Sequence, residues 1–210
     1  MGWFDFVRSP AGTSIETRSI PLFPLNTVLF PGGVQPLKVF EQRYLDMTAA
    51  CMKANQPFGI CLIEQGKEVG QAATPHAIGT LAHIGDWEME QLGILMMTVS
   101  GGQRFRILET RLLENQQLEA SVELLIETQV SLPESRQRLL PLLRRVLSDI
   151  GTQRMPEPHR YDDAAWVGYR LTEILPVQAL AKQKMLELED PLIRLEILEK
   201  FLDQRKLLDY

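Results

Sequence analysis

The chain has 210 residues with 22 basic and 27 acidic side chains, a formal net charge of −5, and 45% of its residues are hydrophobic. This composition is typical of a soluble globular protein, and the length suits one large domain or two small ones, without room for an ATP-driven motor joined to further catalytic modules. Two cysteines, Cys51 and Cys61, form neither a disulfide framework nor a CxxC site, which favours a reducing cytoplasm.

The first 19 residues are predicted to be a flexible leader, apolar and aromatic up to Val7. It lacks the basic-then-apolar order of a secretory signal, and Phe6 stands where myristoylation needs Ser or Thr. The longest attractive apolar run, Leu92 to Val99, is far shorter than the ~20 residues that span a bilayer. These features predict a cytoplasmic protein with no membrane span, and the alternative is a leader that anchors at a membrane interface.

Residues 20–128 have the alternation and the Gly and Pro punctuation of β structure. Strands are predicted at 20–25, 34–40, 58–64, 78–84, 92–99, 103–113 and 118–126. A polar bend at 87–91 is expected to join the strands at 78–84 and 92–99. In the sixth, Phe105 and Ile107 are expected on one face, with Arg104 and Arg106 on the other.

One helix, predicted over 41–55, interrupts the strands with a stripe of Tyr44, Met47, Thr48 and Cys51. Many short strands with one inserted helix favour a small, partly closed β-barrel.

Residues 129–210 have a helical pattern. Ser131 and Glu134 form a predicted capping box at the first helix, and Asp190 with Pro191 a predicted cap at the last. Between them, helices are predicted at 164–175 and after Pro176. The segments are too short to be stable alone, so they should pack as a helical bundle. The fold class is therefore predicted as α+β, with domains at 20–128 and 129–210.

Sets of catalytic residues are scarce. The sequence contains no GxxxxGK[ST] loop, no GxSxG elbow, no HExxH motif and no cysteine pair at zinc spacing. A dyad of Cys51 or Cys61 with His83 stays open as an alternative, but both cysteines lie on apolar faces, which favours buried structural thiols. We therefore expect a protein without catalytic residues, cofactor or metal.

RNA binding is an alternative function, because small β-barrels often bind RNA, but the charge balance makes it the weaker one. Arg104, Arg106 and Arg111 could form a basic stripe. However, residues 1–130 carry 9 basic and 14 acidic side chains, whereas residues 131–210 carry 13 of each. A surface that binds phosphate needs the opposite balance.

A family resemblance rests on collinear motifs. The run from Ile20 to Gly32, IPLFPLNTVLFPG, and the run from Leu37 to Tyr44, LKVFEQRY, resemble the opening of the Lon protease N-terminal domain, most closely its stand-alone bacterial version. Further matches follow in order, at 58–60, 68–70, 78–80, 102–107, 175–176, 182–187 and 194–195.

The resemblance implies a PUA-like β-barrel with a C-terminal helical subdomain. In Lon proteases this domain helps to hold protein substrates, ahead of an ATPase and a Ser–Lys protease module. Together with the missing sets of catalytic residues, the resemblance leads to the hypothesis of a non-catalytic module that recognises unfolded or partly folded protein segments and hands them to a protease or chaperone system. The alternative is an RNA-binding PUA-like protein.

Candidate residues for peptide binding are apolar groups that cannot all lie in a core. They are Trp87, Met89, Leu92, Met96 and Met97. Neighbouring strand residues face opposite sides, so Met96 and Met97 cannot both enter one core. Soft Met and aromatic side chains suit the recognition of varied chains.

Overall fold

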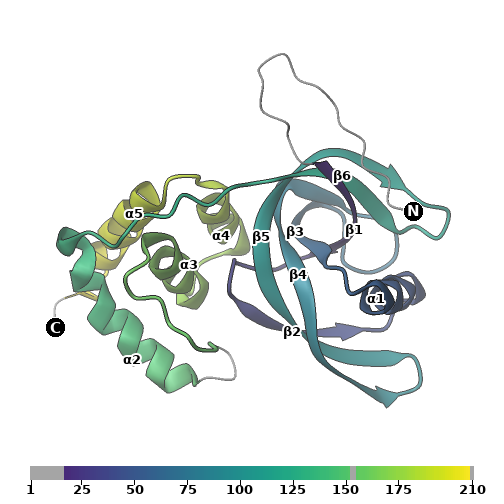
Figure 1. Ribbon diagram of the computed structural model, residues 1–210, viewed down its shortest axis with the longest axis horizontal. Coiled ribbons are helices and arrows are strands. Elements are labelled where there is room, and N and C mark those ends of the chain that lie inside the picture. The colour runs from purple at the N-terminus through teal and green to yellow at the C-terminus, as the bar shows by residue number, and fades with distance from the viewer. Residues whose placement is uncertain (1–16, 152–154, 209–210) are drawn as a thin grey trace. The chain divides into compact units, whose positions relative to one another are not determined.

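The computed structural model describes residues 17–151 and 155–208. Contacts divide this part of the chain into two units, one of residues 17–29 and 35–126 and the other of residues 30–34 and 127–208. The first holds the sheet and one helix, and the second holds the remaining helices (Figure 1). The protein is therefore of mixed α+β class. The predicted leader lies outside the described residues up to position 16, and from Thr17 the chain is strand.

The first unit is built on a six-stranded sheet. Its strands are β1 (Thr17–Leu25), β2 (Val34–Val39), β3 (Phe58–Gln65), β4 (Thr74–Gln91), β5 (Ile94–Leu112) and β6 (Leu118–Leu124). The order is β2-β5-β4-β3-β1-β6, and β6 pairs with β5 as well as with β1. Five of the strands thus form a closed ring, with β2 added outside it. β1 and β3 pair in parallel.

Side chains at alternate positions of the strands lie in two separate apolar cores. On β1, Leu22 enters a core with Phe105 and Val122, while the next residue, Phe23, enters a second core. Helix α1 (Gln42–Ala54) covers that second core with the predicted stripe, whose members are all buried. The ring of Tyr44 stacks on Phe23 at 4.1 Å between centroids.

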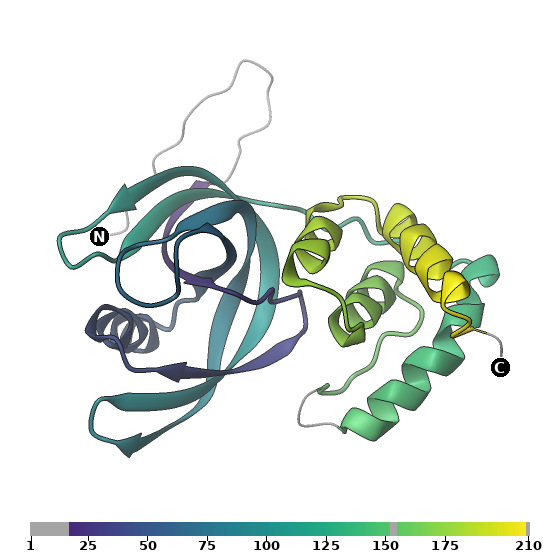
Figure 2. The ribbon, with the colours of Figure 1, turned by 180° about the vertical axis from the view of Figure 1, so that it is seen from behind.

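The second unit packs its helices around a central one. They are the 3-10 helix η1 (Glu134–Leu139), α2 (Leu140–Ile150), α3 (Ala164–Ile174), α4 (Ala179–Glu187) and α5 (Pro191–Gln204). Figures 1 and 2 show α3 between α2, α4 and α5. Asp163 caps α3 by accepting hydrogen bonds from the backbone of Ala165 and Trp166, and Asp190 caps α5 as predicted.

Two local predictions were wrong. The bend expected at 87–91 is strand, because β4 and β5 stay paired from Trp87–Met97 to Gln91–Ile94 and the turn falls at Gly93, whose φ of +83° favours glycine. The capping box at Ser131 does not form, since η1 follows Pro133 without a side-chain cap.

Candidate functional site

The hairpin of β4 and β5 exposes three large apolar side chains near its turn. Leu92 is 99% exposed, Trp87 57% and Met89 51%. We call these three residues the hairpin surface. Exposed apolar groups of this size, close together in the chain, are typical of interaction sites on soluble proteins.

The other two residues predicted for peptide binding do not belong to this surface. Met97 is 3% exposed and lies in the core with Leu95 and Val99, so it is removed from the candidate set. Met96 is half-buried and lies across from Glu88 on the neighbouring strand. The alternation along β5 therefore separates two methionines that are adjacent in sequence.

A cavity of about 230 Å³ adjoins Trp87. It is lined by Cys51, Met52, Asn55, Gln56, His83, Ile84, Gly85 and Trp87. The structure thus brings Cys51 and His83 to one cavity. Burial raises the pKa of the Cys51 thiol and that of Cys61, so both thiols are protonated at neutral pH. A protonated thiol is a poor nucleophile, and the geometry favours a binding cavity over a catalytic dyad.

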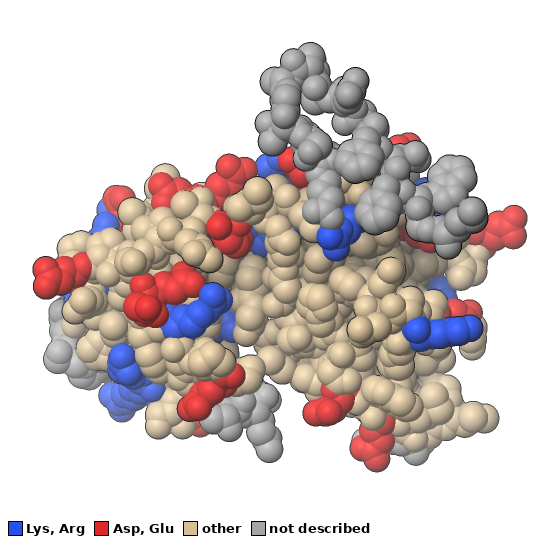
Figure 3. Space-filling model, in the orientation of Figure 1, with Lys and Arg blue, Asp and Glu red and all other residues tan. Residues whose placement is uncertain are grey.

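The three arginines considered for RNA do not form a basic stripe. Arg104 is 1% exposed, so it offers no charge to a basic stripe on the surface. Arg106 and Arg111 bind carboxylates of β6, at 3.2 Å to Glu123 and 2.6 Å to Glu119. Among the described residues on the face shown in Figure 3, basic and acidic side chains are interspersed.

Neither a cluster of metal-binding side chains nor a helix able to cross a membrane is found in the described part of the chain. Nowhere in residues 17–151 and 155–208 do three His, Cys, Asp or Glu side chains gather as a metal site would require. None of the helices in those ranges has the length and apolar character needed to cross a membrane.

A second apolar surface lies in the helical unit, and the sequence reasoning missed it. An open groove of about 590 Å³, the helical groove, runs between the end of α3, α4 and α5. Its lining is mostly apolar: Thr172, Leu175, Val177, Ala181, Lys184, Met185, Glu187, Leu188, Ile197, Leu198 and Phe201. The available signal was α5 itself, which carries more apolar residues than one buried face accounts for.

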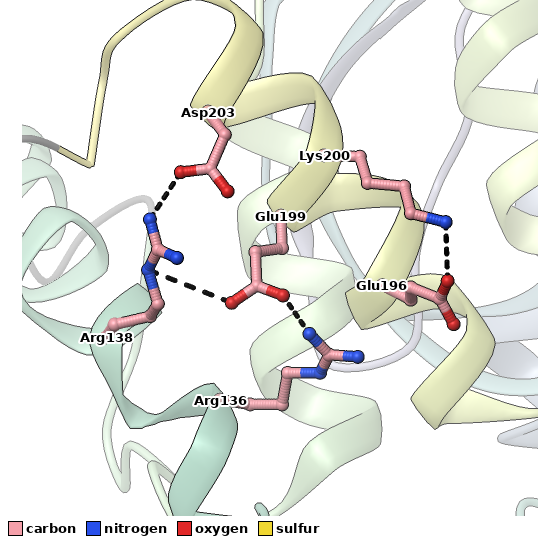
Figure 4. Close-up of polar contacts among 6 residues, drawn as sticks. All are labelled: Arg136, Arg138, Glu196, Glu199, Lys200 and Asp203. Atoms are coloured by element: carbon pink, nitrogen blue, oxygen red, sulfur yellow. Dashed lines mark hydrogen bonds and ion pairs between the residues drawn. The ribbon is translucent and has the colours of Figure 1, made fainter.

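Ion pairs hold one side of α5 against η1. Arg136 pairs with Glu199, and Arg138 pairs with both Glu199 and Asp203 (Figure 4). This cluster occupies the side of α5 opposite the helical groove, so the groove side carries no such contact with η1.

The motif at residues 30–34 is bound within the second unit by a buried arginine. Arg170 of α3 donates to the backbone oxygens of Gly32 at 2.5 Å and Pro31 at 3.0 Å. Its guanidinium also lies 3.1 Å from the Glu173 carboxylate. Burial raises the pKa of Glu173, against the opposing effect of Arg170 and Lys182. A Cβ at Gly33 would lie 2.7 Å from that carboxylate and 3.0 Å from the backbone oxygen of Phe30, so a larger residue there would have to displace the Glu173 side chain.

A closed ring of strands in one unit and a set of packed helices in the other define a protein of two-unit α+β architecture. The family model for the substrate-binding domain of the ATP-dependent protease La (Lon) matches residues 19–204. The chain belongs to this family of Lon substrate-binding domains, as its motifs predict.

Solved structures agree with the family assignment. A Lon N-terminal domain protein from Xanthomonas campestris is 34% identical, with a TM-score of 0.73 over 87% of this chain and 98% of that one. The N-terminal domain of a Mycobacterium avium complex Lon protease is 18% identical and shares the fold, with a TM-score of 0.60 over 89% of this chain and 97% of that one. A comparison with curated protein sequences gives no match.

Proposed function

We propose that this protein binds apolar segments of unfolded or partly folded proteins, without acting on them chemically, and passes them to a protease or chaperone system in the cytoplasm. The family supports protein substrates as the class of partner, because the matching model describes a substrate-binding domain. We propose further that the ring of strands is a PUA-like barrel and that α2 to α5 form the C-terminal helical bundle.

The observation that carries the proposal is the hairpin surface. Trp87, Met89 and Leu92 are each more than half exposed and lie within six positions of the chain at the end of one hairpin. Met and aromatic side chains adapt to varied partners, since thioethers are flexible and rings provide large contact area. The cavity beside Trp87, lined by polar as well as apolar side chains, adds a recess next to this surface.

Binding of an unfolded model protein tests the proposal. The full chain is titrated with a reduced, carboxymethylated model protein and with the same protein in its folded form. We expect binding of the unfolded form alone, and a loss of about tenfold or more in affinity for Leu92→Asp combined with Trp87→Ala.

A matched control is Leu108→Asp, which places the same charge at an exposed apolar position of β5 outside the hairpin surface. This variant should bind like the unaltered protein. Equal binding by the hairpin variant and the control would contradict the proposed site, and no preference for the unfolded form would contradict the proposed function.

RNA binding is not favoured by the described residues. Arg104 is buried, and Arg106 and Arg111 each bind a glutamate. Phosphate contacts would have to displace these carboxylates, which lowers the gain from each contact.

A further inference from the structure

The second half of β4 has a strand partner on one side alone among the described strands. Pairing with β3 ends at Phe58–Ala82, because β3 begins at Phe58. β4 itself continues to Gln91 and stays paired with β5 as far as Gln91–Ile94, as a two-stranded hairpin (Figure 1). β3 and β5 are the neighbours of β4 in the sheet, so residues 83–91 form a strand edge, which we call the β4 edge.

The chain that precedes β3 leaves a recess beside this edge. Helix α1 ends at Ala54, and Asn55 takes a left-handed conformation with a φ of +50°, which turns the chain before it enters β3. Residues of this turn and of β4 line the cavity of about 230 Å³, among them Gln56, His83 and Gly85. The β4 edge therefore begins at an open recess instead of under a covering strand.

A strand edge of this kind is a template for a further strand. Backbone N–H and C=O groups at alternate positions of an edge strand point away from its one partner. An extended peptide that lies along the edge pairs with these groups and lengthens the sheet by one strand. Main-chain hydrogen bonds of this kind do not depend on the peptide's sequence, so the side chains beside the edge decide which peptides fit.

Trp87 and Glu88 set what the added strand should carry. Trp87 lies directly across from Met97 on β5, and Glu88 across from Met96. Directly paired residues share a face of a sheet, whereas neighbours along a strand face opposite sides, so Trp87 and Glu88 lie on different faces. Both are exposed. A segment along the β4 edge thus meets an aromatic ring on one face and a carboxylate on the other, which favours an apolar residue next to a basic one.

The β4 edge also has features that prevent indiscriminate pairing. β4 has one residue more than β5 between Ile84 and Trp87, and again after Glu88, and such bulges together with charged side chains protect strand edges. Asp86 and Glu88 are exposed, and residues 83–91 contain no Lys or Arg. Acids repel acidic segments and attract basic ones, so this protection is selective.

We propose that a segment of an unfolded protein binds by adding a strand to the β4 edge, and that the preferred segment alternates apolar with basic residues. Main-chain hydrogen bonds hold the segment, Trp87 selects apolar residues on one face, and Glu88 selects lysine or arginine on the other. The inference rests on the proposed function and specifies how the hairpin bearing the hairpin surface engages a bound segment.

Fluorescence anisotropy with the full chain and labelled synthetic peptides tests the proposal. The probe peptide alternates four valines with three lysines, which places all valines on one face of a strand and all lysines on the other. We expect saturable binding of this peptide. A second peptide, with glutamates in place of the lysines, should bind at least about tenfold more weakly.

N-methylation tests whether the probe pairs as a strand. Successive residues of a strand direct their N–H groups to opposite sides, so either the valine or the lysine N–H groups face β4. Two further probes carry N-methyl groups on the three lysines or on the last three valines. One of them should bind at least about tenfold more weakly than the parent peptide, and the other should bind like the parent.

Glu88→Lys tests the selection by charge. This variant should bind the lysine peptide about threefold or more weakly and the glutamate peptide more tightly by a similar factor. Glu114→Lys is the matched control, since it makes the same change at an exposed glutamate between β5 and β6 and should leave both affinities unchanged. Far-UV circular dichroism and thermal unfolding establish that each variant is folded.

The outcomes separate this proposal from the proposed function. If the carboxymethylated model protein binds but the two N-methylated peptides bind equally, strand addition is overturned and the proposed function stands. If Glu88→Lys and Glu114→Lys have equal effects, net charge holds the peptide and the role of Glu88 is overturned. If neither the model protein nor the valine–lysine peptide binds, both proposals are overturned. If one N-methylated peptide alone loses affinity while the model protein does not bind, strand addition is supported and the proposed function is contradicted.

Discussion

Replacement of Arg170 by methionine tests how the chain holds the turn at residues 30–34. Arg170 is 1% exposed and is the donor to the backbone oxygens of both Pro31 and Gly32. Methionine preserves much of the aliphatic stem and removes the guanidinium. The variant therefore leaves two carbonyl groups without this donor, and Glu173 without its ion-pair partner.

The expected loss follows from these contacts. A hydrogen bond to a charged group contributes about 1.5–3 kcal/mol, and removal of one partner of a buried ion pair costs about 3–5 kcal/mol. The two effects overlap because the same guanidinium makes all three contacts. We therefore expect the free energy of unfolding of the helical unit to fall by about 3–5 kcal/mol.

Urea unfolding, followed by far-UV circular dichroism and by the fluorescence of buried Trp166, measures this change. Arg138→Met is the control, because it removes an arginine that is about half exposed in the same unit. Ion pairs of that kind contribute about 0–1 kcal/mol. Equal destabilisation by Arg170→Met and Arg138→Met would refute the reasoning.

Two further predictions concern the same unit. Burial raises the pKa of Glu173, so its contribution to folding is greatest below the unfolded-state pKa and is lost as pH rises through the raised folded-state value. Urea titrations of the unaltered protein and of Glu173→Gln measure this effect as the difference between their free energies of unfolding. The unaltered protein should lose stability relative to the variant from pH ~4 towards neutrality. A gain in its relative stability over this range would contradict the prediction. Asp163→Ala removes the cap of α3 and should cost about 0.5–2 kcal/mol. Ser131→Ala should cost less, since Ser131 caps no helix, and a larger loss for Ser131→Ala in thermal unfolding would contradict the assignment of the cap.

Much of the fold could be predicted because local patterns and tertiary packing agree. The stripe on α1 is buried as its helical spacing predicts, and Asp190 caps α5 where an acid followed by proline indicates a helix start. The hairpin turn was misplaced because pairing with β5 carries β4 through a polar segment that would not form a strand by propensity alone.

The candidate surfaces were less predictable. Exposure of Trp87, Met89 and Leu92 could be inferred from their place in a polar, turn-like segment. The helical groove could not, because its lining comes from three separate segments, the end of α3, α4 and α5, whose arrangement no spacing in the sequence reports. The burial of Arg104 could not be predicted either, because alternation places it opposite Phe105 but does not report that both faces of the strand are covered.

The sequence by itself determined the family, the α+β class and most helix and strand positions, because motifs, alternation and caps are local features that each depend on a few neighbouring residues. Only the tertiary structure decided which apolar side chains stay exposed, how Arg170 binds a turn far away in the chain, and that an apolar groove lies between the end of α3, α4 and α5. These properties depend on contacts between segments distant in sequence, and burial is a result of those contacts.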